Sequence, residues 1–242
     1  MAGRTPRRSG QRANSELLTR DLIVTTALRL VDADGMDSLT MRALADALNV
    51  YPTAVYWHVG SKSNLIGLVA ERVFDELTLP DDNQLSWDEW LGEVVRQWRV
   101  VMHRHPNVAV MSAGKLLTTT AALPFIERVV AVLQRAGLSG QQLADVYNAV
   151  LGFAFGWVST ELSEEPSDAD DTWPAEFEEA LTGLSNVAYP ALTRNMPDLI
   201  NRTLLLRWSS GRDRPLDSGF DLALTSLLDG LRRATRSRQG TS

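Results

Sequence analysis

The amino-acid sequence predicts an all-α protein. Apolar residues recur at three- and four-residue steps, the period of one helix face, beginning with Leu22, Ile23, Ala27, Leu30 and Val31. No segment shows the sustained alternation of apolar and polar residues that marks a strand, and no hairpin turn signal is present. The 242 residues are 44% apolar and 22% charged. That composition is ordinary for a globular protein with a sizeable core.

Composition excludes several classes of protein. The chain has no cysteine, so disulfides, thiolate metal sites and thiol nucleophiles are excluded. No run approaches the ~18 apolar residues of a membrane span, and the basic start of the chain lacks the apolar stretch of a secretory signal. We therefore expect a soluble, cytoplasmic protein with no membrane partner.

Charge is distributed unevenly along the chain. Residues 1–78 contain nine basic and nine acidic side chains, so the net charge of -6 falls on the remainder. Residues 1–16 are rich in Arg, Ser and Gly without an apolar period, and we expect a disordered basic arm. Such an arm could orient the protein on a polyanion, or it could serve only as a soluble tail.

Residues 17–78 are expected to form one domain. Its helices are predicted over about 19–35, 40–48, 52–58 and 61–77. Thr40 and Ser61 suit helix N-caps, and Gly35 suits the end of the first helix.

Residues 79–86 predict a boundary loop, after which 79–242 form a second domain. Its helices are expected over about 87–104, 121–136, 139–162, 174–189, 196–208 and 217–236. Between residues 161 and 179 lie nine acidic side chains and no basic one. This run favours a solvated loop leading into a helix, with a cation site as the alternative.

The segments on either side of Asn49 have the spacing of a helix-turn-helix. Ala45 is small enough to let the second helix approach closely, and Asn49 tolerates the positive φ that such a turn often requires. The inner faces are formed by Leu44, Leu48, Val50 and Val55. Pro52 suits the first turn of a helix. A short recognition helix is therefore predicted over 52–58.

The N-terminal part resembles the tetracycline-repressor (TetR) family of bacterial transcriptional regulators. The resemblance lies in LTMRALADALNV, AVYWHV and Lys62-x-x-Leu65, preceded by a helix with Ala27 and Gly35. Asn49 departs from the family, which usually has Gly there. SWDEWL, AGLSGQQLADVYNAVLGFAFGWV and FDLALTSLLDGL resemble the ligand-binding domain of the tetracycline-repressor type. The resemblance implies a three-helix DNA-binding head, followed by a larger helical domain for effector binding and dimerisation.

Exposed side chains of the recognition helix are the candidates for DNA contact. Base edges or thymine methyls are assigned to Tyr51, Pro52, Thr53 and Trp57, and phosphates to Tyr56, His58 and Lys62. The family resemblance adds Thr40 and Arg42. The alternative is that Tyr56 and Trp57 pack against the first helix. Val55 is assigned to the core.

The second domain is expected to hold a small-molecule effector. The resemblance favours Val94, Trp98, Met111, Ser112, Phe125, Phe153 and Trp157 as its contacts, and the alternative is that these bulky residues form ordinary core. Where the tetracycline repressor has ligand-facing histidines, the match places Thr78, Ser112 and Gly152. We therefore expect an apolar, aromatic or polycyclic effector bound without a metal or cofactor.

Catalytic motifs are missing from the sequence, so we do not expect an enzyme. His103 and His105 are two apart, face different sides of a helix, and are interpreted as cationic tips at its end.

Gly152 and Gly156 lie four apart and favour a close helix contact. Together with Leu224, Leu227, Leu228 and Leu231 they predict a homodimer face, with packing inside one subunit as the alternative. The sequence thus favours a ligand-responsive repressor on a near-palindromic operator. The alternative is an α-helical binding or enzymatic protein whose head is only structural.

Overall fold

The computed structural model describes residues 18–81, 84–112, 120–163, 170–207, 213 and 215–239, and this part of the chain is helical without a strand. The predicted all-α class is confirmed, while the predicted arm over 1–16 lies outside the described residues. The helices are α2 (Arg20–Asp34), α3 (Met41–Ala47), α4 (Pro52–Val59), α5 (Lys62–Phe74), α6 (Trp87–Arg104), α7 (Pro106–Ser112), α8 (Leu123–Arg135), α9 (Gly140–Glu161), α10 (Trp173–Thr182), α11 (Pro190–Leu199) and α12 (Asp217–Gln239).

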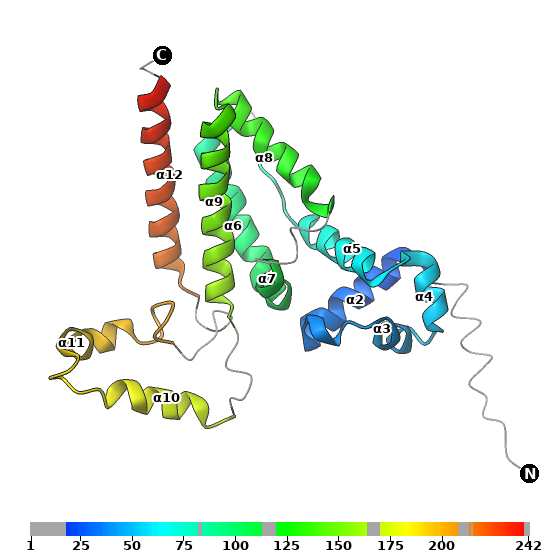
Figure 1. Cartoon of the computed structure of the whole chain (residues 1–242), viewed down its shortest axis with the longest axis horizontal. Coiled ribbons are helices and arrows are strands. Elements are labelled where there is room, and N and C mark those ends of the chain that lie inside the picture. Colours follow the sequence, from blue (N-terminus) through cyan, green and yellow to red (C-terminus); the bar gives the residue numbers. More distant parts are fainter. Residues whose placement is uncertain are drawn as a thin grey trace, which may run out of the picture.

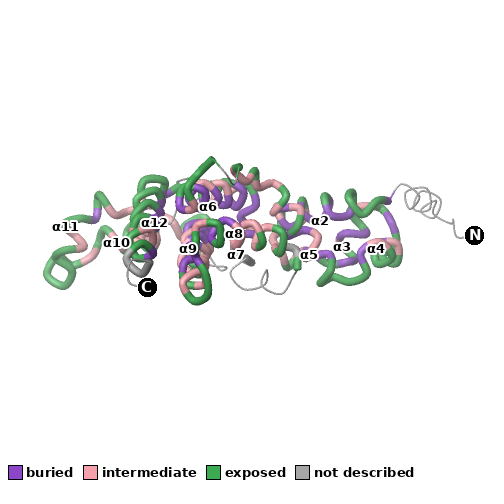
Figure 2. Tube along the Cα trace, turned by 90° about the horizontal axis from the view of Figure 1, so that it is seen from above, coloured by how far each residue is buried: buried purple, intermediate pink, exposed green. Residues whose placement is uncertain are grey.

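The molecule is elongated. Helices α2 to α5 form a head at one end, and α6 to α9 with α12 form the body (Figure 1). Helices α10 and α11 lie at the other end of the molecule, away from the head, in both views (Figures 1 and 2). Within the described residues, no helix is both long and apolar enough to span a bilayer.

Local signals set the helix ends in the head. The Thr40 hydroxyl accepts a hydrogen bond from the Ala43 amide at 3.0 Å, and the Ser61 hydroxyl accepts one from Asn64 at 3.1 Å. Both predicted N-caps are therefore confirmed. Asn49 has a φ of 52°, as the helix-turn-helix interpretation required. Leu44, Ala45 and Val55 are fully buried where α3 and α4 pack on α2.

The body is built on the packing of α6 against α9 and α12. Figure 2 shows buried positions along these helices. One stripe of α12 faces α6 and α9. It consists of Phe220, Leu224 and Leu228, and the buried Leu216 comes just before the helix. A Cβ added at Gly92 would lie 3.1 Å from Leu228 Cδ1, so this glycine permits the close approach of α6 and α12. Leu224 and Leu228 therefore serve the subunit's own core, and their assignment to a dimer face was wrong.

Two helix predictions in the second half had wrong bounds, and one helix was not predicted. The helix predicted over 174–189 is α10, which ends at Thr182. The helix predicted over 196–208 is α11, which begins at Pro190 and ends at Leu199. Proline suits the first position of a helix because its missing N–H has no intrahelical partner there. After α11 the chain turns at Asn201, whose φ is 55°. The separate helix α7, which begins at Pro106, was missed.

Glu161 joins three helices of the body. Its carboxylate accepts hydrogen bonds from Arg99 Nε at 2.8 Å and Arg99 Nη2 at 2.7 Å, and from the Leu216 amide at 2.7 Å. His103 Nε2 lies 3.2 Å away. Arg99 also pairs with Asp217, the first residue of α12, at 2.8 Å. The side chain of Glu161 is therefore a fully buried tie, and its placement in a solvated acidic loop was wrong.

The environment of Glu161 also shifts its acidity. Burial alone would raise the pKa of this carboxyl group, but the hydrogen bonds from Arg99, His103 and Leu216, with the charge of Arg99, lower it to about 2. Among the described residues, no group of three or more histidines and acids is placed to hold a metal ion.

We predict that Glu161→Gln destabilises the protein by roughly 3–5 kcal/mol at pH 7, because it removes the fully buried carboxylate that pairs with Arg99 and leaves Arg99 with Asp217 alone. A carboxyl group whose pKa falls on folding stabilises the protein above its unfolded value of 4.5 and loses that contribution as the pH falls towards 2. Urea unfolding at fixed protein concentration should show the wild type and the variant converging over that window. The exposed Glu127→Gln is the control, and parallel pH curves for wild type and Glu161→Gln would contradict the prediction.

Candidate functional site

The recognition helix α4 is anchored by one face and leaves the other open. Val55 and Val59 are buried, whereas Trp57 is 88% exposed, Tyr56 47% and Tyr51 46%. On a helix of eight residues, this pattern places the valines against the head and the aromatic rings outside it. The alternative in which Trp57 and Tyr56 pack against the first helix is not the arrangement found.

The other DNA candidates lie on α3, α4 and α5 or at the ends of these helices. Pro52, Thr53, Arg42 and Lys62 are exposed, and His58 is half-buried. Thr40 caps α3 with its hydroxyl oxygen, which leaves the hydroxyl proton free to donate. Their roles in DNA contact stay predictions.

This surface suits a nucleic acid chemically. Helix α4 has no acidic residue, and it combines a hydroxyl, an imidazole and two aromatic rings. Short helices of this kind enter the major groove, where apolar groups meet thymine methyls and polar tips meet base edges. Flanking Arg and Lys side chains can pair with phosphates and set the register.

The head is held to the body through the end of α6. His105 Nδ1 lies 3.0 Å from the Asp32 carboxylate of α2, and His105 Nε2 lies 2.9 Å from Glu76, just after α5. Asn107 donates to the carbonyl oxygens of Val31 and Asp32 at 2.9 and 3.2 Å. His105 is buried in this joint, and His103 is bound to Glu161. The two histidines do lie at the end of α6, as interpreted from the sequence, but each is bound to carboxylates and neither is a free tip.

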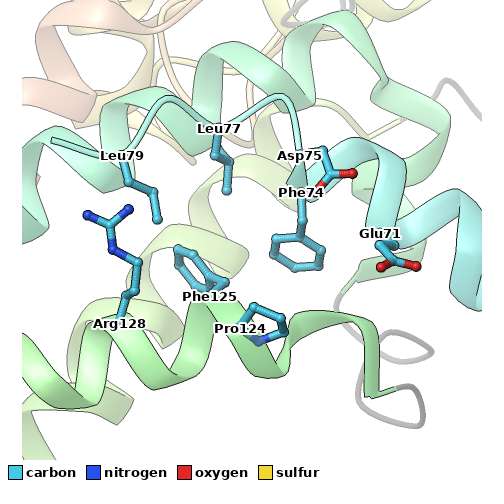
Figure 3. Close-up of a pocket in the computed structure, with 8 residues that line it drawn as sticks. All are labelled: Glu71, Phe74, Asp75, Leu77, Leu79, Pro124, Phe125 and Arg128. Atoms are coloured by element: carbon cyan, nitrogen blue, oxygen red, sulfur yellow. The ribbon is translucent and has the colours of Figure 1, made fainter.

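A cavity of about 260 Å³ lies where the end of α5 meets α8 (Figure 3). Its wall is made of Glu71, Phe74, Asp75, Leu77, Leu79, Pro124, Phe125 and Arg128. The rings of Phe74 and Phe125 contact each other with centroids 5.6 Å apart. Trp98 stacks on Phe74 at 5.4 Å from the side of α6. The cavity therefore touches both the last helix of the head and the body.

The predicted effector residues are not all brought together. Phe125 lines this cavity and Trp98 lies against its Phe74 wall, while Val94 is buried in the core. Phe153 and Trp157 pack around Phe220 in a second aromatic cluster. Met111 and Ser112 end α7, but their side chains lie outside the described residues.

Sequence reasoning missed most of the cavity wall. Phe74 and Leu77 continue the apolar face of α5 in the sequence. The spacing of apolar residues therefore could not distinguish a cavity wall from the core at these positions. Leu79 falls in the predicted boundary loop. Arg128 gave no signal, because a single cation on an amphipathic helix is expected at the surface.

Two protein-family models match the chain. The model described as "Bacterial regulatory proteins, tetR family" matches residues 23–69, and "Tetracyclin repressor-like, C-terminal domain" matches residues 79–235. The chain belongs to the TetR family. The resemblance inferred from the sequence is thereby confirmed, and this TetR-family protein is a DNA-binding transcriptional regulator.

Individual relatives agree with this assignment. An HTH-type transcriptional regulator of Saccharopolyspora erythraea is 34% identical over 187 residues, covering 77% of this chain and 78% of the relative. The HTH-type transcriptional repressor DrrR1 of Streptomyces coeruleorubidus is 23% identical over 247 residues, covering 99% and 85%. The crystal structure of the TetR family protein ActR from Streptomyces coelicolor in complex with actinorhodin matches with a TM-score of 0.68 at 25% identity, covering 90% and 96%.

We predict different effects for two substitutions on the head. Lys62→Ala should weaken binding to all DNA sequences and reduce the salt slope by about 1, because it removes one phosphate contact. Trp57→Ala should reduce the discrimination between bases at the position that Trp57 contacts, by ~1–3 kcal/mol. Selection from a random duplex library, followed by titration at several salt concentrations, measures both effects.

Val187→Ala is the control for exposure, since Val187 is also 88% exposed but lies outside the head. If both head variants bind DNA as the wild type does, the assignment of α4 to the groove is wrong.

Proposed function

We propose that this TetR-family protein is a homodimeric repressor without catalytic activity. In this proposal a small aromatic effector, bound without a metal, releases it from a near-palindromic operator. The observation that carries the proposal is the outward-facing recognition helix, on which Trp57 is 88% exposed while Val55 is fully buried. A large exposed apolar side chain on a firmly anchored helix is typical of a binding surface.

Repression and effector binding are supported by what the relatives are named for. DrrR1 is named a transcriptional repressor, and ActR was crystallised with actinorhodin. In this chain the cavity at the end of α5 has walls of phenylalanine, leucine and proline, which suit an organic ligand with an apolar ring system.

The placement of that cavity supports a physical route from ligand to DNA. Phe74 is the last residue of α5, and α5 packs against α2 and α4 in the head. A ligand that separates Phe74 from Phe125 would favour one position of α5 over another. Only such differential affinity for two positions of the head can shift the DNA-binding equilibrium.

A dimer face is supported by one side of α9. The exposed stripe of this helix contains Gln141, Asp145, Asn148, Gly152 and Gly156. A Cβ added at Gly152 or Gly156 would meet no atom within 4 Å. On α12 beside it, Leu222 is 71% exposed. Small residues with open space beside them allow a helix of a second copy to approach closely, and the two-fold axis would pair the two heads.

Selection of bound sequences from a random duplex library tests the proposed function. We expect enriched sequences that contain two inverted half-sites one helical turn or a multiple apart, because two α4 helices would read them. Repression is then measured with a reporter gene placed behind a selected site. Enrichment of single half-sites, or activation of the reporter, would contradict the proposal.

We predict that Gly156→Arg gives a folded monomer. The new side chain has open space in its own subunit but would collide with a second copy across the two-fold axis. Sedimentation equilibrium measures the mass, and circular dichroism checks that helix content is retained. Gln134→Arg, an exposed change of similar size on α8, is the control and should stay dimeric. A dimer of undiminished affinity in Gly156→Arg would exclude this face.

A further inference from the structure

We propose that the cavity between α5 and α8 takes an aromatic organic cation, whose positive group faces Glu71 and Asp75. This inference rests on the proposed function in one respect: it treats the cavity as an effector site. It goes further by naming the charge and the orientation of the ligand.

The middle of the cavity is an aromatic surface with a rigid support. In Figure 3 the rings of Phe74 and Phe125 lie between the acidic end and Arg128, with Pro124 beside them. Trp98 stacks behind Phe74, and Phe155 meets Trp98 edge-on at 5.2 Å. Flat, polarisable walls of this kind bind a flat ring and also attract a cation held near their faces.

One end of the cavity is strongly electronegative. Glu71 and Asp75 lie one helical turn apart on α5, so their like charges repel and favour a cation nearby. Asp75 is also the C-cap of α5, where the helix dipole adds a partial negative charge. Three sources of negative potential therefore coincide at this end.

Within the described residues, the two nearby arginines form no ion pair with Glu71 or Asp75. Arg72 is held by the carboxylate of Asp21 and donates to the Thr25 hydroxyl at 3.0 Å. Arg20 lines the neighbouring groove together with Glu71 and Asp75, but forms no ion pair with either within the described part of the chain. The exposed carboxylates of Glu71 and Asp75 line the cavity without forming an ion pair to any residue that the structure describes.

The opposite end fixes the direction of the ligand. Arg128 donates to the Pro80 carbonyl oxygen at 3.0 Å and lies over the Trp90 ring, with 5.8 Å from its guanidinium carbon to the ring centroid. This held positive charge repels the cationic group of a ligand. A ring with one amine therefore fits in one orientation, with the amine towards Glu71 and Asp75.

Three tricyclic probes of nearly equal shape test the charge preference. At pH 7.5, 9-aminoacridine is a cation, acridine is neutral and acridine-9-carboxylate is an anion. Calorimetric titration of the full chain in the absence of DNA should give at least about tenfold tighter binding for the cation than for acridine, with the anion weakest. Equal affinities for cation and neutral probe, or no measurable binding of any probe, would overturn the proposal.

Variants locate the effect in this cavity. The double variant Glu71→Gln/Asp75→Asn should lose most of the preference for the cation while binding acridine as before. Phe125→Ala should weaken the binding of all three probes, because it removes an aromatic ring that each of them would contact. Glu127→Gln also removes a carboxylate charge, one residue from Arg128 at an exposed position, and should alter nothing. A preference that survives the double variant would place the cation elsewhere and overturn the proposal.

DNA binding of each variant, measured without probe on a selected duplex, separates this inference from the proposed function. Normal DNA binding with no preference for the cationic probe would overturn the ligand assignment alone. A preference for the cation with no sequence-selective DNA binding would remove the proposed function and leave the cavity assignment standing.

Discussion

The contact between His105 and two carboxylates is the constraint on which the relation of head to body depends. One nitrogen reaches Asp32 on α2 and the other reaches Glu76 after α5, at 3.0 and 2.9 Å. The end of α6 is thereby bound to both helices that carry the recognition unit. A shift of α6 or α7 must either move the head or break the hydrogen-bonded contacts of the buried His105, which is costly.

The cavity proposed to bind the effector lies at the other end of α5. Phe74 closes α5 at the cavity, while the start of α5 packs on the recognition helix. A single helix of 13 residues therefore borders both the cavity and the recognition helix. Because helices do not compress along their axis, displacement at one end is transmitted to the other. Moving a two-state equilibrium from 1:99 to 99:1 takes about 5.5 kcal/mol of differential binding, which is the difference in affinity that the proposed effector would need between two positions of α5.

The apolar side chains that α4 exposes to solvent are offset by apolar side chains buried on the other side of the same helix. Trp57 and Tyr56 leave apolar area in water, and Val55 and Val59 on the opposite side of the same short helix are buried. In the body, the tie from Glu161 to Arg99 and to the start of α12 holds the helices that carry the open face of α9. Rigid support behind both surfaces lets exposed side chains keep one position, which favours specific over indiscriminate contact.

Signals confined to a few neighbouring residues determined the head. The cap at Thr40, the positive φ at Asn49 and the proline at the start of α4 are local backbone requirements, so the sequence alone predicted the helix-turn-helix and its outward residues. The body depended on contacts between distant segments. In the sequence, Glu161 is one acidic residue among several neighbouring ones. Its pairing with Arg99, 62 residues away, exists only in the folded protein. Leu228 and Phe74 each lie on an apolar helix face. The spacing of apolar residues indicates that such a face is buried, but it does not indicate which other surface covers it. Only the tertiary structure decided that Leu228 meets Gly92 inside the subunit and that Phe74 borders a cavity, because which surfaces meet depends on how separate helices pack.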